Sequence, residues 1–381
     1  MKAHPRSGTL VTQLEGYRAF EPTPLPPSPR LQFDDALLRQ LVQANLALGR
    51  LDGLASTLPG ADLFLSMYVR HEALVSSRIE GTQCTLDDVV AAVLSSWQEG
   101  SRDVGDVVRY VAALNHGVAR LGELPLSMRL VREMHEVLLR DGRGSEKTPG
   151  EFRRTQNWIG PAGCTLADAR FVPPPVHVMN DALGDLEVFL HDEGLSALLV
   201  AGLAHAQFET IHPFLDGNGR TGRLLIALIL HDREVLCRPI LYLSAYFKEH
   251  QREYYRRLTS VREDGDWEGW MAFFLSAVTS SAIHATHTAM EITRIHSIDR
   301  ELVVSSGGNK HDIRLLDALY SQPIVNVAWV ERELNVSKVT ANRIVARLES
   351  LGILRETTGF SRNRRFRYDS YLRIFEAMTP Q

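Results

Sequence analysis

The chain has 381 residues, of which 44% are hydrophobic and 23% are charged, and its formal net charge is −4. This composition is that of an ordinary soluble protein with ample core, and it gives no global reason to expect nucleic acid as a partner. The length predicts two or three domains. The longest uninterrupted apolar run, Leu224 to Leu230, is far too short to span a membrane, so we expect no membrane contact.

The cysteines and the first residues indicate a compartment. Cys84, Cys164 and Cys237 are odd in number and widely spaced, which is typical of reduced thiols. The first six residues lack the apolar segment of a signal peptide. We therefore expect a cytoplasmic protein.

Composition and periodicity divide the chain into five predicted regions. The fold class that we predict is mainly α: an all-helical core with a β-hairpin flap, plus a small C-terminal α+β domain. The predicted regions are a Pro-rich extended arm (1–33), a helical region (34–124), a helical core (125–276), a long helix with a Ser-Gly-rich linker (277–309), and a last domain (310–381).

Within the first helical region, apolar residues from Leu63 to Ile79 recur at helical spacing. This places Ser76 and Glu80 on one face of the predicted helix. Gly81 follows and is typical of a helix C-cap, so one interpretation is a solvated glutamate at a helix end. A functional interpretation of Ser76 and Glu80 depends on residues 212–223, much later in the chain.

The next informative segment is residues 151–175, for which we predict a hairpin-like flap. Thr155, Trp158 and Ile159 favour extended structure, and residues 160–163 contain two glycines and a proline that favour a turn. An exposed strand edge of this kind can bind an extended segment of a second protein by strand addition.

The most polar loop, residues 212–223, lies between two apolar, helix-like runs. Gly217 and Gly219 allow positive φ and close approach of a ligand to the backbone. Arg220 and Arg223 are three residues apart on the first turn of the following helix, where free N–H groups and the helix dipole favour an anion. The loop therefore predicts a phosphate site.

Two further side chains of this loop carry groups that can take part in a reaction on a bound phosphate. Asp216 offers the hard oxygen that Mg²⁺ prefers beside substrate phosphates. His212 ordinarily titrates near neutrality and could take a proton from an attacking hydroxyl. The chain has no Gly-x-x-x-x-Gly-Lys-Ser/Thr run, so the site is not a P-loop. A zinc hydrolase is the alternative, because His205, Glu209 and His212 share a helix face, but that site would not require the glycines.

The last domain differs in charge from the rest of the chain. Residues 310–381 contain 12 Lys and Arg against 8 Asp and Glu. We predict helices at 311–320, 327–334 and 338–351 and a basic hairpin at 353–368, an order that resembles a winged helix-turn-helix. One interpretation is DNA binding, with Lys338, Thr340, Asn342 and Arg343 in the major groove. The other is a winged helix that binds protein or dimerises.

The run His-Pro-Phe-x-Asp-Gly-Asn-Gly-Arg-x-x-Arg at 212–223 resembles the signature of the Fic family of nucleotidyltransferases. The resemblance implies transfer of AMP from Mg-ATP to a Ser, Thr or Tyr hydroxyl of a target protein. It implies that His212 deprotonates that hydroxyl and that Asp216 holds Mg²⁺. The nucleotide-binding residues that it implies are Gly217, Asn218, Gly219, Arg220, Thr221, Gly222, Arg223, His250 and Tyr255. His250 stands where the family often has Asn.

The segment from Ser76 to Gly81 is similar to the inhibitory pattern of the same family, Ser/Thr-x-x-x-Glu-Gly/Asn. This implies that Glu80 pairs with Arg223 and keeps ATP from its productive position, within one chain or between the chains of a homodimer. Residues 151–175 resemble the flap that aligns the target. Two alternatives stay open: removal of AMP from modified proteins, and a nucleotide-sensing transcriptional regulator that binds DNA.

Overall fold

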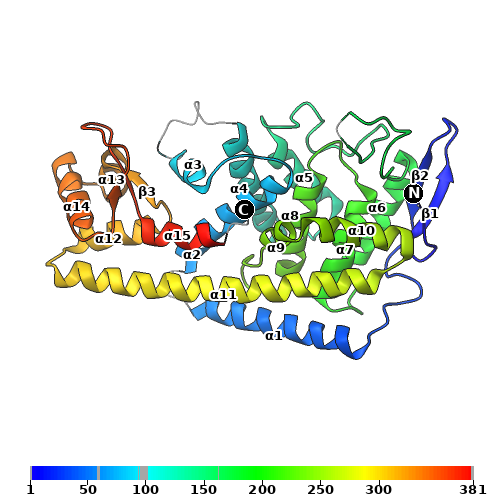
Figure 1. Ribbon diagram of the computed structural model, residues 1–381, viewed down its shortest axis with the longest axis horizontal. Helices are drawn as coiled ribbons and strands as arrows, with labels where there is room; N and C mark the ends of the chain where they lie inside the picture. The colour runs from blue at the N-terminus through cyan, green and yellow to red at the C-terminus, as the bar shows by residue number, and fades with distance from the viewer. Residues whose placement is uncertain (1, 58–60, 93, 95–101, 162, 379–381) are drawn as a thin grey trace. The chain divides into compact units, whose positions relative to one another are not determined.

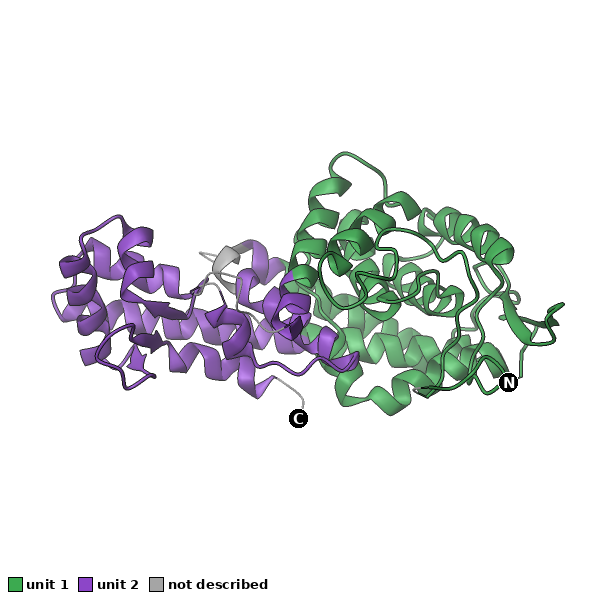
Figure 2. Ribbon diagram, turned by 90° about the horizontal axis from the view of Figure 1, so that it is seen from above, with its two compact units in different colours: residues 1–52, 109–282 green, residues 53–108, 283–381 purple. Residues whose placement is uncertain are grey.

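The computed structural model describes residues 2–57, 61–92, 94, 102–161 and 163–378. It is mainly helical, as predicted, with one two-stranded and one three-stranded antiparallel sheet among these residues (Figure 1). The chain forms two compact units, residues 1–52 with 109–282 and residues 53–108 with 283–381 (Figure 2). Within the described ranges, no helix combines the length and the apolar character that crossing a membrane requires.

The first unit is built around two consecutive helices, α7 (Ala197–Ile211) and α8 (Asn218–Asp232). Every residue of α7 from Leu198 to Ile211 is buried, as expected for a helix that is apolar on nearly all sides. Because both helices are buried in the core, the segment that connects them is fixed at both of its ends. The other elements are most of α1 (Asp35–Thr57) and of α4 (Arg102–Leu121), all of α5 (Met128–Leu139), α6 (Val176–Leu190), α9 (Ser244–Glu249) and α10 (Gln251–Asp264), and the first part of α11 (Trp267–Ser305).

The predicted N-terminal arm contains a hairpin. Strands β1 (Gly8–Thr12) and β2 (Arg18–Pro22) pair antiparallel, with Gly8 opposite Pro22. The N–H of Phe20 donates to the carbonyl oxygen of Val172 at 2.9 Å, which attaches the hairpin beside the predicted flap. These strands are not predicted from the sequence, because each has only five residues and a proline-rich stretch follows them.

The second unit contains the predicted small α+β region together with helices from the first third of the chain. Its sheet has the order β3-β5-β4, and the side chains of Asn309, Asn326 and Ser337 cap three of its helices. Its elements are α2 (Ala61–Ile79), α3 (Leu86–Ala91), α12 (Lys310–Leu319), β3 (Ile324–Asn326), α13 (Val327–Leu334), α14 (Lys338–Ser350), β4 (Arg355–Glu356), β5 (Arg365–Arg367) and α15 (Asp369–Ala377). The winged-helix assignment stays a prediction.

The compact units combine segments from several predicted regions. The predicted helical region 34–124 is divided between them, and α11 contributes residues to both. Helices that are separated in the chain can share a core, whereas composition and linkers only mark local changes along it. The predicted five-part division therefore stays a prediction.

Candidate functional site

The connection between α7 and α8 has two residues in the left-handed conformation. His212 is the C-cap of α7, with φ of 49°, and its N–H donates to the carbonyl oxygen of Phe208 at 2.9 Å. Gly217 has φ of 76° and is the N-cap of α8. A non-glycine residue in this region is uncommon, and here the helix end on one side and the turn on the other fix it. The fold thus places His212 where α7 ends, four residues before Asp216.

The side chain of Asn218 forms two hydrogen bonds with the main chain inside the loop. Its Oδ1 accepts from the N–H of Phe214 at 2.9 Å, and its Nδ2 donates to the carbonyl oxygen of the same residue at 2.8 Å. The side chain is buried. Both polar atoms of Asn218 therefore shape the loop, and a direct contribution to phosphate binding would come from its main chain.

A histidine that the sequence did not single out supports the loop from α5. The N–H of Gly150 donates to Nδ1 of His135 at 2.9 Å, so Nε2–H donates to the carbonyl oxygen of Asp216, at 3.0 Å. The His135 ring stacks on Phe214, with 3.6 Å between ring centroids. Burial, and next the charge of Arg220, lower the pKa of His135 to about 4 despite its hydrogen bond to Asp216, so the ring is neutral.

The predicted flap is hydrogen-bonded to the loop that begins at His212. Nε of Arg153 and Nδ2 of Asn157 donate to the carbonyl oxygen of His212, at 3.1 and 3.2 Å. The N–H of Arg153 donates to the carbonyl oxygen of Pro213 at 2.9 Å. Further on, Ile159 and Phe171 form an antiparallel bridge with N–H···O distances of 2.8 and 3.0 Å. The two arms of the predicted hairpin therefore pair, and their base is fixed to His212.

The environment of His212 keeps its imidazole neutral. Burial comes first, then the positive charges of Arg262 and Arg153, and together they lower the pKa of His212 to about 3 against a main-chain hydrogen bond to Glu209 that raises it. Nε of Arg262 donates to Oγ1 of Thr210 at 3.1 Å, which fixes its position one turn before the loop. At neutral pH the ring is an acceptor of protons.

The first turn of α8 buries cationic and hydroxyl groups. Arg220 is 3% exposed, and its nearest approach to Asp216 is 3.7 Å. Nε of Arg220 and Oγ1 of Thr221 are buried and have no hydrogen-bond partner among the residues that the structure describes. Arg223 is also buried. An unsatisfied buried donor is costly, and an anion at this helix N-terminus would satisfy it.

The predicted base-binding residues lie on α9 and α10. His250 joins these helices, and its ring stacks on Tyr246 with 4.2 Å between centroids. Tyr255 is 44% exposed, and its buried neighbour Tyr254 donates its hydroxyl to Nε2 of His205 at 2.8 Å. Because Nδ1–H of His205 donates to Gly222 at 3.0 Å, this histidine joins α10 to α8. A contact of His250 or Tyr255 with a nucleotide base stays a prediction.

The residues of the loop fit a magnesium ion that arrives with phosphates. Asp216 is partly exposed, and its Oδ1 accepts from the N–H of Gly217. Mg²⁺ commonly binds through one carboxylate plus substrate phosphates, so Asp216 alone suffices. A zinc site is not supported, since both ring nitrogens of His205 are hydrogen-bonded. Within the described ranges, no three His, Cys, Asp or Glu side chains are grouped so as to hold a metal.

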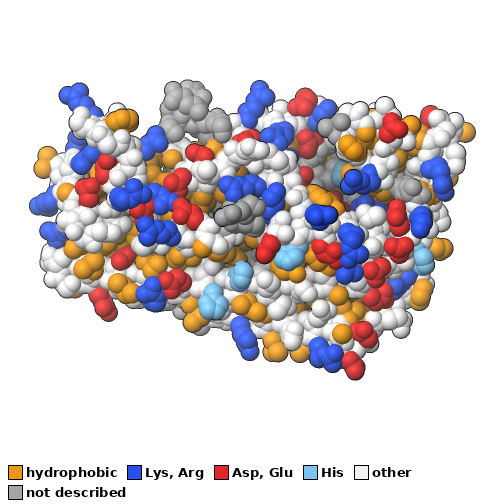
Figure 3. Space-filling view, in the orientation of Figure 1, with side chains coloured by type: hydrophobic (Ala, Val, Ile, Leu, Met, Phe, Trp, Pro, Cys, Tyr) orange, Lys and Arg blue, Asp and Glu red, His pale blue; other side chains and the backbone are white. Residues whose placement is uncertain are grey.

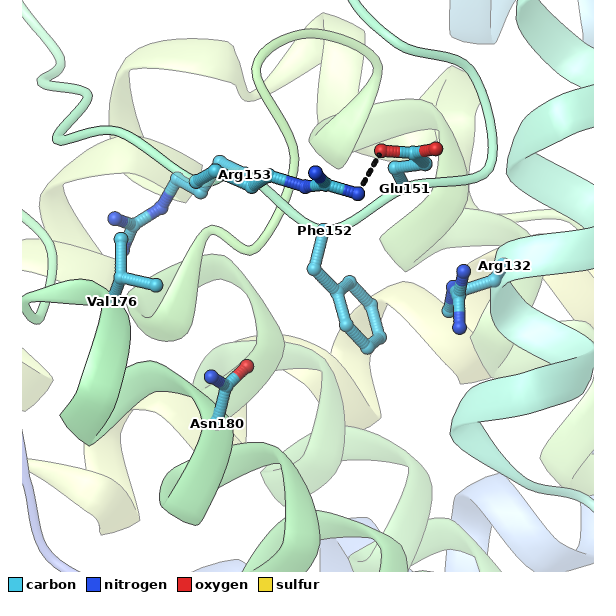
Figure 4. Close-up of a pocket in the computed structure, with 7 residues that line it drawn as sticks. Arg132, Glu151, Phe152, Arg153, Val176 and Asn180 are labelled. Carbon is cyan, nitrogen blue, oxygen red and sulfur yellow. Dashed lines mark hydrogen bonds and ion pairs between the residues drawn. The ribbon is translucent and has the colours of Figure 1, made fainter.

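A cavity of about 270 Å³ lies beside the start of the predicted flap. Figure 4 shows Arg132 from α5, Asn180 from α6, Phe152 and Glu151 around it. Arg154, which also lines the cavity, forms an ion pair with Glu151 at 3.0 Å. Nε of Arg132 donates to the carbonyl oxygen of Gly150 at 2.8 Å, and its guanidinium lies over the Phe152 ring. This cavity was not predicted, because its walls come from three separate segments.

The predicted inhibitory residues belong to the second unit. Ser76 is buried in the last turn of α2, and Glu80 follows that helix in an exposed turn before Gly81, which has φ of 92°. Arg223, by contrast, belongs to the first unit. The pairing of Glu80 with Arg223 therefore stays a prediction.

Comparisons with known proteins agree with this geometry. Residues 38–119 match the model described as Fic/DOC family N-terminal, and residues 125–230 match the Fic/DOC family model. Both ranges therefore match the Fic/DOC family. The predicted resemblance is thereby confirmed.

Among curated relatives, the chain is similar to the protein adenylyltransferase fic-1 of Caenorhabditis briggsae, with 30% identity over 173 residues, which span 43% of this chain and 31% of that protein. It is 29% identical over 154 residues to the protein adenylyltransferase Fic of Drosophila grimshawi, covering 40% of this chain and 28% of the relative. The chain thus matches less than a third of these relatives' length.

A solved structure extends the likeness in fold. A Fic family protein from Desulfovibrio desulfuricans G20 aligns with 89% of this chain and 97% of its own, with a TM-score of 0.57 and 21% identity. A Fic domain-containing signalling protein from Bacteroides thetaiotaomicron covers 66% of this chain and 97% of its own, with a TM-score of 0.55 and 18% identity. At these identities the likeness establishes the mainly helical fold.

Proposed function

We propose that this chain is a protein adenylyltransferase that transfers AMP from Mg-ATP to a Ser, Thr or Tyr hydroxyl of a target protein and of itself. The observation that carries the proposal is the juxtaposition of a neutral His212 with the buried Arg220 and Thr221 at the start of α8. A helix N-terminus at which a buried guanidinium Nε has no hydrogen-bond partner among the described residues favours phosphates, and the adjacent imidazole can accept a proton. The names of the curated relatives support the same reaction.

In the proposed reaction, the acceptor oxygen attacks the α-phosphorus of ATP. A new oxygen–phosphorus bond forms, the bond between the α-phosphorus and the bridging oxygen breaks, and pyrophosphate leaves. His212 accepts the hydroxyl proton. Arg220 and Arg223, with the main-chain N–H groups of residues 217–219, bind the phosphates and stabilise the negative charge that develops on them. Asp216 would hold Mg²⁺, which would neutralise further negative charge on the phosphates.

The flap is the proposed docking site of the acceptor segment. Its base is hydrogen-bonded to His212, so an extended segment paired with its edge would lie close to the catalytic imidazole. The cavity of Arg132 and Asn180 lies at the beginning of the same segment and could receive a side chain of the acceptor.

Inhibition by Glu80 is part of the proposal. The Ser/Thr-x-x-x-Glu-Gly pattern at Ser76 to Gly81 supports it, and breaking a buried pair between Glu80 and Arg223 would cost about 3–5 kcal/mol. The same glutamate could orient a water that removes AMP from modified proteins, the alternative reaction. The inhibition would act within one chain or between the two chains of a homodimer. A cytoplasmic location completes the proposal.

Labelled nucleotides test the reaction. Purified protein is incubated with α-labelled ATP, UTP or GTP, and label retained on denatured protein is measured. We expect AMP transfer that His212→Ala lowers by about 10²–10⁴, while the exposed histidine variant His177→Ala behaves like the parent. Glu80→Gly should raise automodification. Label that persists undiminished in His212→Ala contradicts the proposed base.

A nucleotide-sensing regulator that binds DNA is the second candidate. It is favoured by exposed residues on α14 and on the hairpin that follows: Lys338, Val339, Arg343, Arg362 and Arg365. Figure 3 shows Lys and Arg side chains over this part of the chain. Binding of labelled duplex DNA at several salt concentrations tests it, since phosphate contacts give an affinity that falls steeply with salt. Affinity that does not change with salt, or no binding, rejects this candidate.

A further inference from the structure

The short helix α3, which follows the predicted inhibitory motif, is fastened to the C-terminal sheet. Nε and Nη2 of Arg367 on β5 donate to the two carboxylate oxygens of Asp87, at 2.9 and 3.0 Å. Nε2 of Gln322, just before β3, donates to the carbonyl oxygen of Val90 at 2.9 Å. All four residues belong to the second unit, so α3 is part of the same body as residues 310–378.

Helix α2, which carries the motif, is attached to that body as well. Nη1 of Arg70 donates to the carbonyl oxygen of Ser321 at 2.6 Å. The buried ring of His71 lies 6.0 Å from that of Phe375 on α15. The inhibitory helix is therefore packed on C-terminal residues that lie about 250 to 300 positions later in the chain.

The turn between α2 and α3 is tightly bonded. The N–H groups of Glu80 and Thr82 both donate to the carbonyl oxygen of Ser77 at 3.1 Å. Nη2 of Arg78 donates to the carbonyl oxygen of Cys84 at 2.8 Å. Because the chain from Ser77 to Cys84 bonds to itself in this way, a displacement of α3 is transmitted to Glu80.

The position of α3 depends on its contacts with the sheet. It has six residues, and a helix of that length is not stable by itself in water. The Arg367 side chain is 9% exposed and also pairs with Asp369 and Glu376. Burial would lower the pKa of Arg367, but its hydrogen bonds to Asp87 and Asp369 outweigh burial and raise the pKa, so the guanidinium stays charged. The fork with Asp87 is thus a fixed attachment point.

We infer that residues 310–378 hold the inhibitory segment in place through the contact of Arg367 with Asp87, and so set the strength of inhibition by Glu80. The inference rests on the proposed function. A ligand that moves β5 would change the activity of the enzyme through α3, without any contact with the nucleotide.

The test compares Asp87→Asn with Arg294→Gln. Arg294 pairs with Glu291 on the exposed surface of α11 within the same unit, so its variant removes an ion pair that has no part in holding α3. We expect Asp87→Asn to raise automodification about fivefold, which corresponds to about 1 kcal/mol, and Arg294→Gln to leave it unchanged. Amide hydrogen exchange at residues 77–91 should accelerate in Asp87→Asn alone.

The combination with Glu80→Gly separates the two proposals. If Glu80→Gly raises automodification, Asp87→Asn in that background should add nothing, because both act on the same inhibition. If Glu80→Gly is active but Asp87→Asn matches the parent in both activity and exchange, the inference is wrong and the proposed inhibition stands. If Glu80→Gly has no effect, the proposed inhibition fails, and unchanged exchange in Asp87→Asn then rejects the attachment too. Arg367→Lys, which keeps the charge but loses the fork, gives a second variant should Asp87→Asn unfold.

Discussion

Each compact unit buries an arginine, but the two units stabilise the charge in opposite ways. In the first, Arg153 is 1% exposed, and among the residues described its guanidinium donates to three main-chain carbonyl oxygens, those of His212, Thr155 and Pro174. In the second, Arg367 donates to three carboxylates. Burial lowers the pKa of Arg153 to about 10, whereas at Arg367 the carboxylates outweigh burial and raise it.

This difference separates a ligand site from a structural link. A buried cation held by carbonyl dipoles leaves a positive potential around it, and Arg262 adds to that potential near His212. Such a site is complementary to an anion. The carboxylates around Arg367 remove that potential, and the cluster joins chain segments instead. We expect the two units to respond differently to anions, acid and the loss of an arginine.

The largest expected effect is on the titration of His212. Its pKa of about 3 in the folded chain lies well below the ordinary value of about 6.5. The folded state therefore gains stability from this group above pH 6.5, and loses it as the pH falls toward 3. NMR titration should find the ring neutral at pH 5, and Arg262→Gln should raise its pKa. If the ring instead titrates near pH 6.5, the positive potential that we infer around His212 is contradicted.

The next effect is on stability at the flap. Arg153→Lys loses the fork to the carbonyl oxygens, and we expect the free energy of unfolding to fall by about 1.5–3 kcal/mol. The neighbouring Arg154 has a side chain that is 83% exposed, so Arg154→Lys should change it by less than about 0.5 kcal/mol. Urea unfolding measures both. Equal values for the two variants would show that the carbonyl cluster contributes no stability.

Pyrophosphate should stabilise the first unit. At ten times its dissociation constant, the expected gain is about 1.4 kcal/mol, detected as a higher melting temperature. Arg220→Gln should abolish the gain, and chloride at the same ionic strength should not reproduce it. A shift that persists in Arg220→Gln would place the anion somewhere other than the start of α8.

The smallest effect concerns acid in the second unit. Hydrogen bonds from Arg355 and next Arg367 lower the pKa of Asp369 against the opposing effect of burial. The contribution of Asp369 to stability is present above its unfolded pKa and is lost as the pH falls. We expect Asp369→Asn to lower stability by about 0.5–1 kcal/mol at pH 7, and by less at pH 3. A penalty that is independent of pH would mean that Asp369 acts through packing rather than charge.

Local patterns predicted several elements closely. The helix predicted from Leu63 to Ile79 is α2, and the one predicted at 338–351 is α14. Both could be predicted because helical spacing and capping residues lie within short stretches of sequence. The roles of His135, Asn157 and Arg262 were not predicted. Each of them contacts the loop or the end of α7 from more than 30 positions away in the chain. Periodicity within a short stretch of sequence cannot reveal such a contact.

The sequence by itself determined the residue types of the loop at 212–223, its place between two apolar helices and its match to the Fic/DOC family. Only the tertiary structure decided that His212 is neutral, that the side chain of Asn218 shapes the loop, and that the predicted inhibitory motif folds with the C-terminal residues. The reason is physical: residue types and spacing fix local conformation, whereas burial, charge environment and partnership depend on segments that only folding brings together.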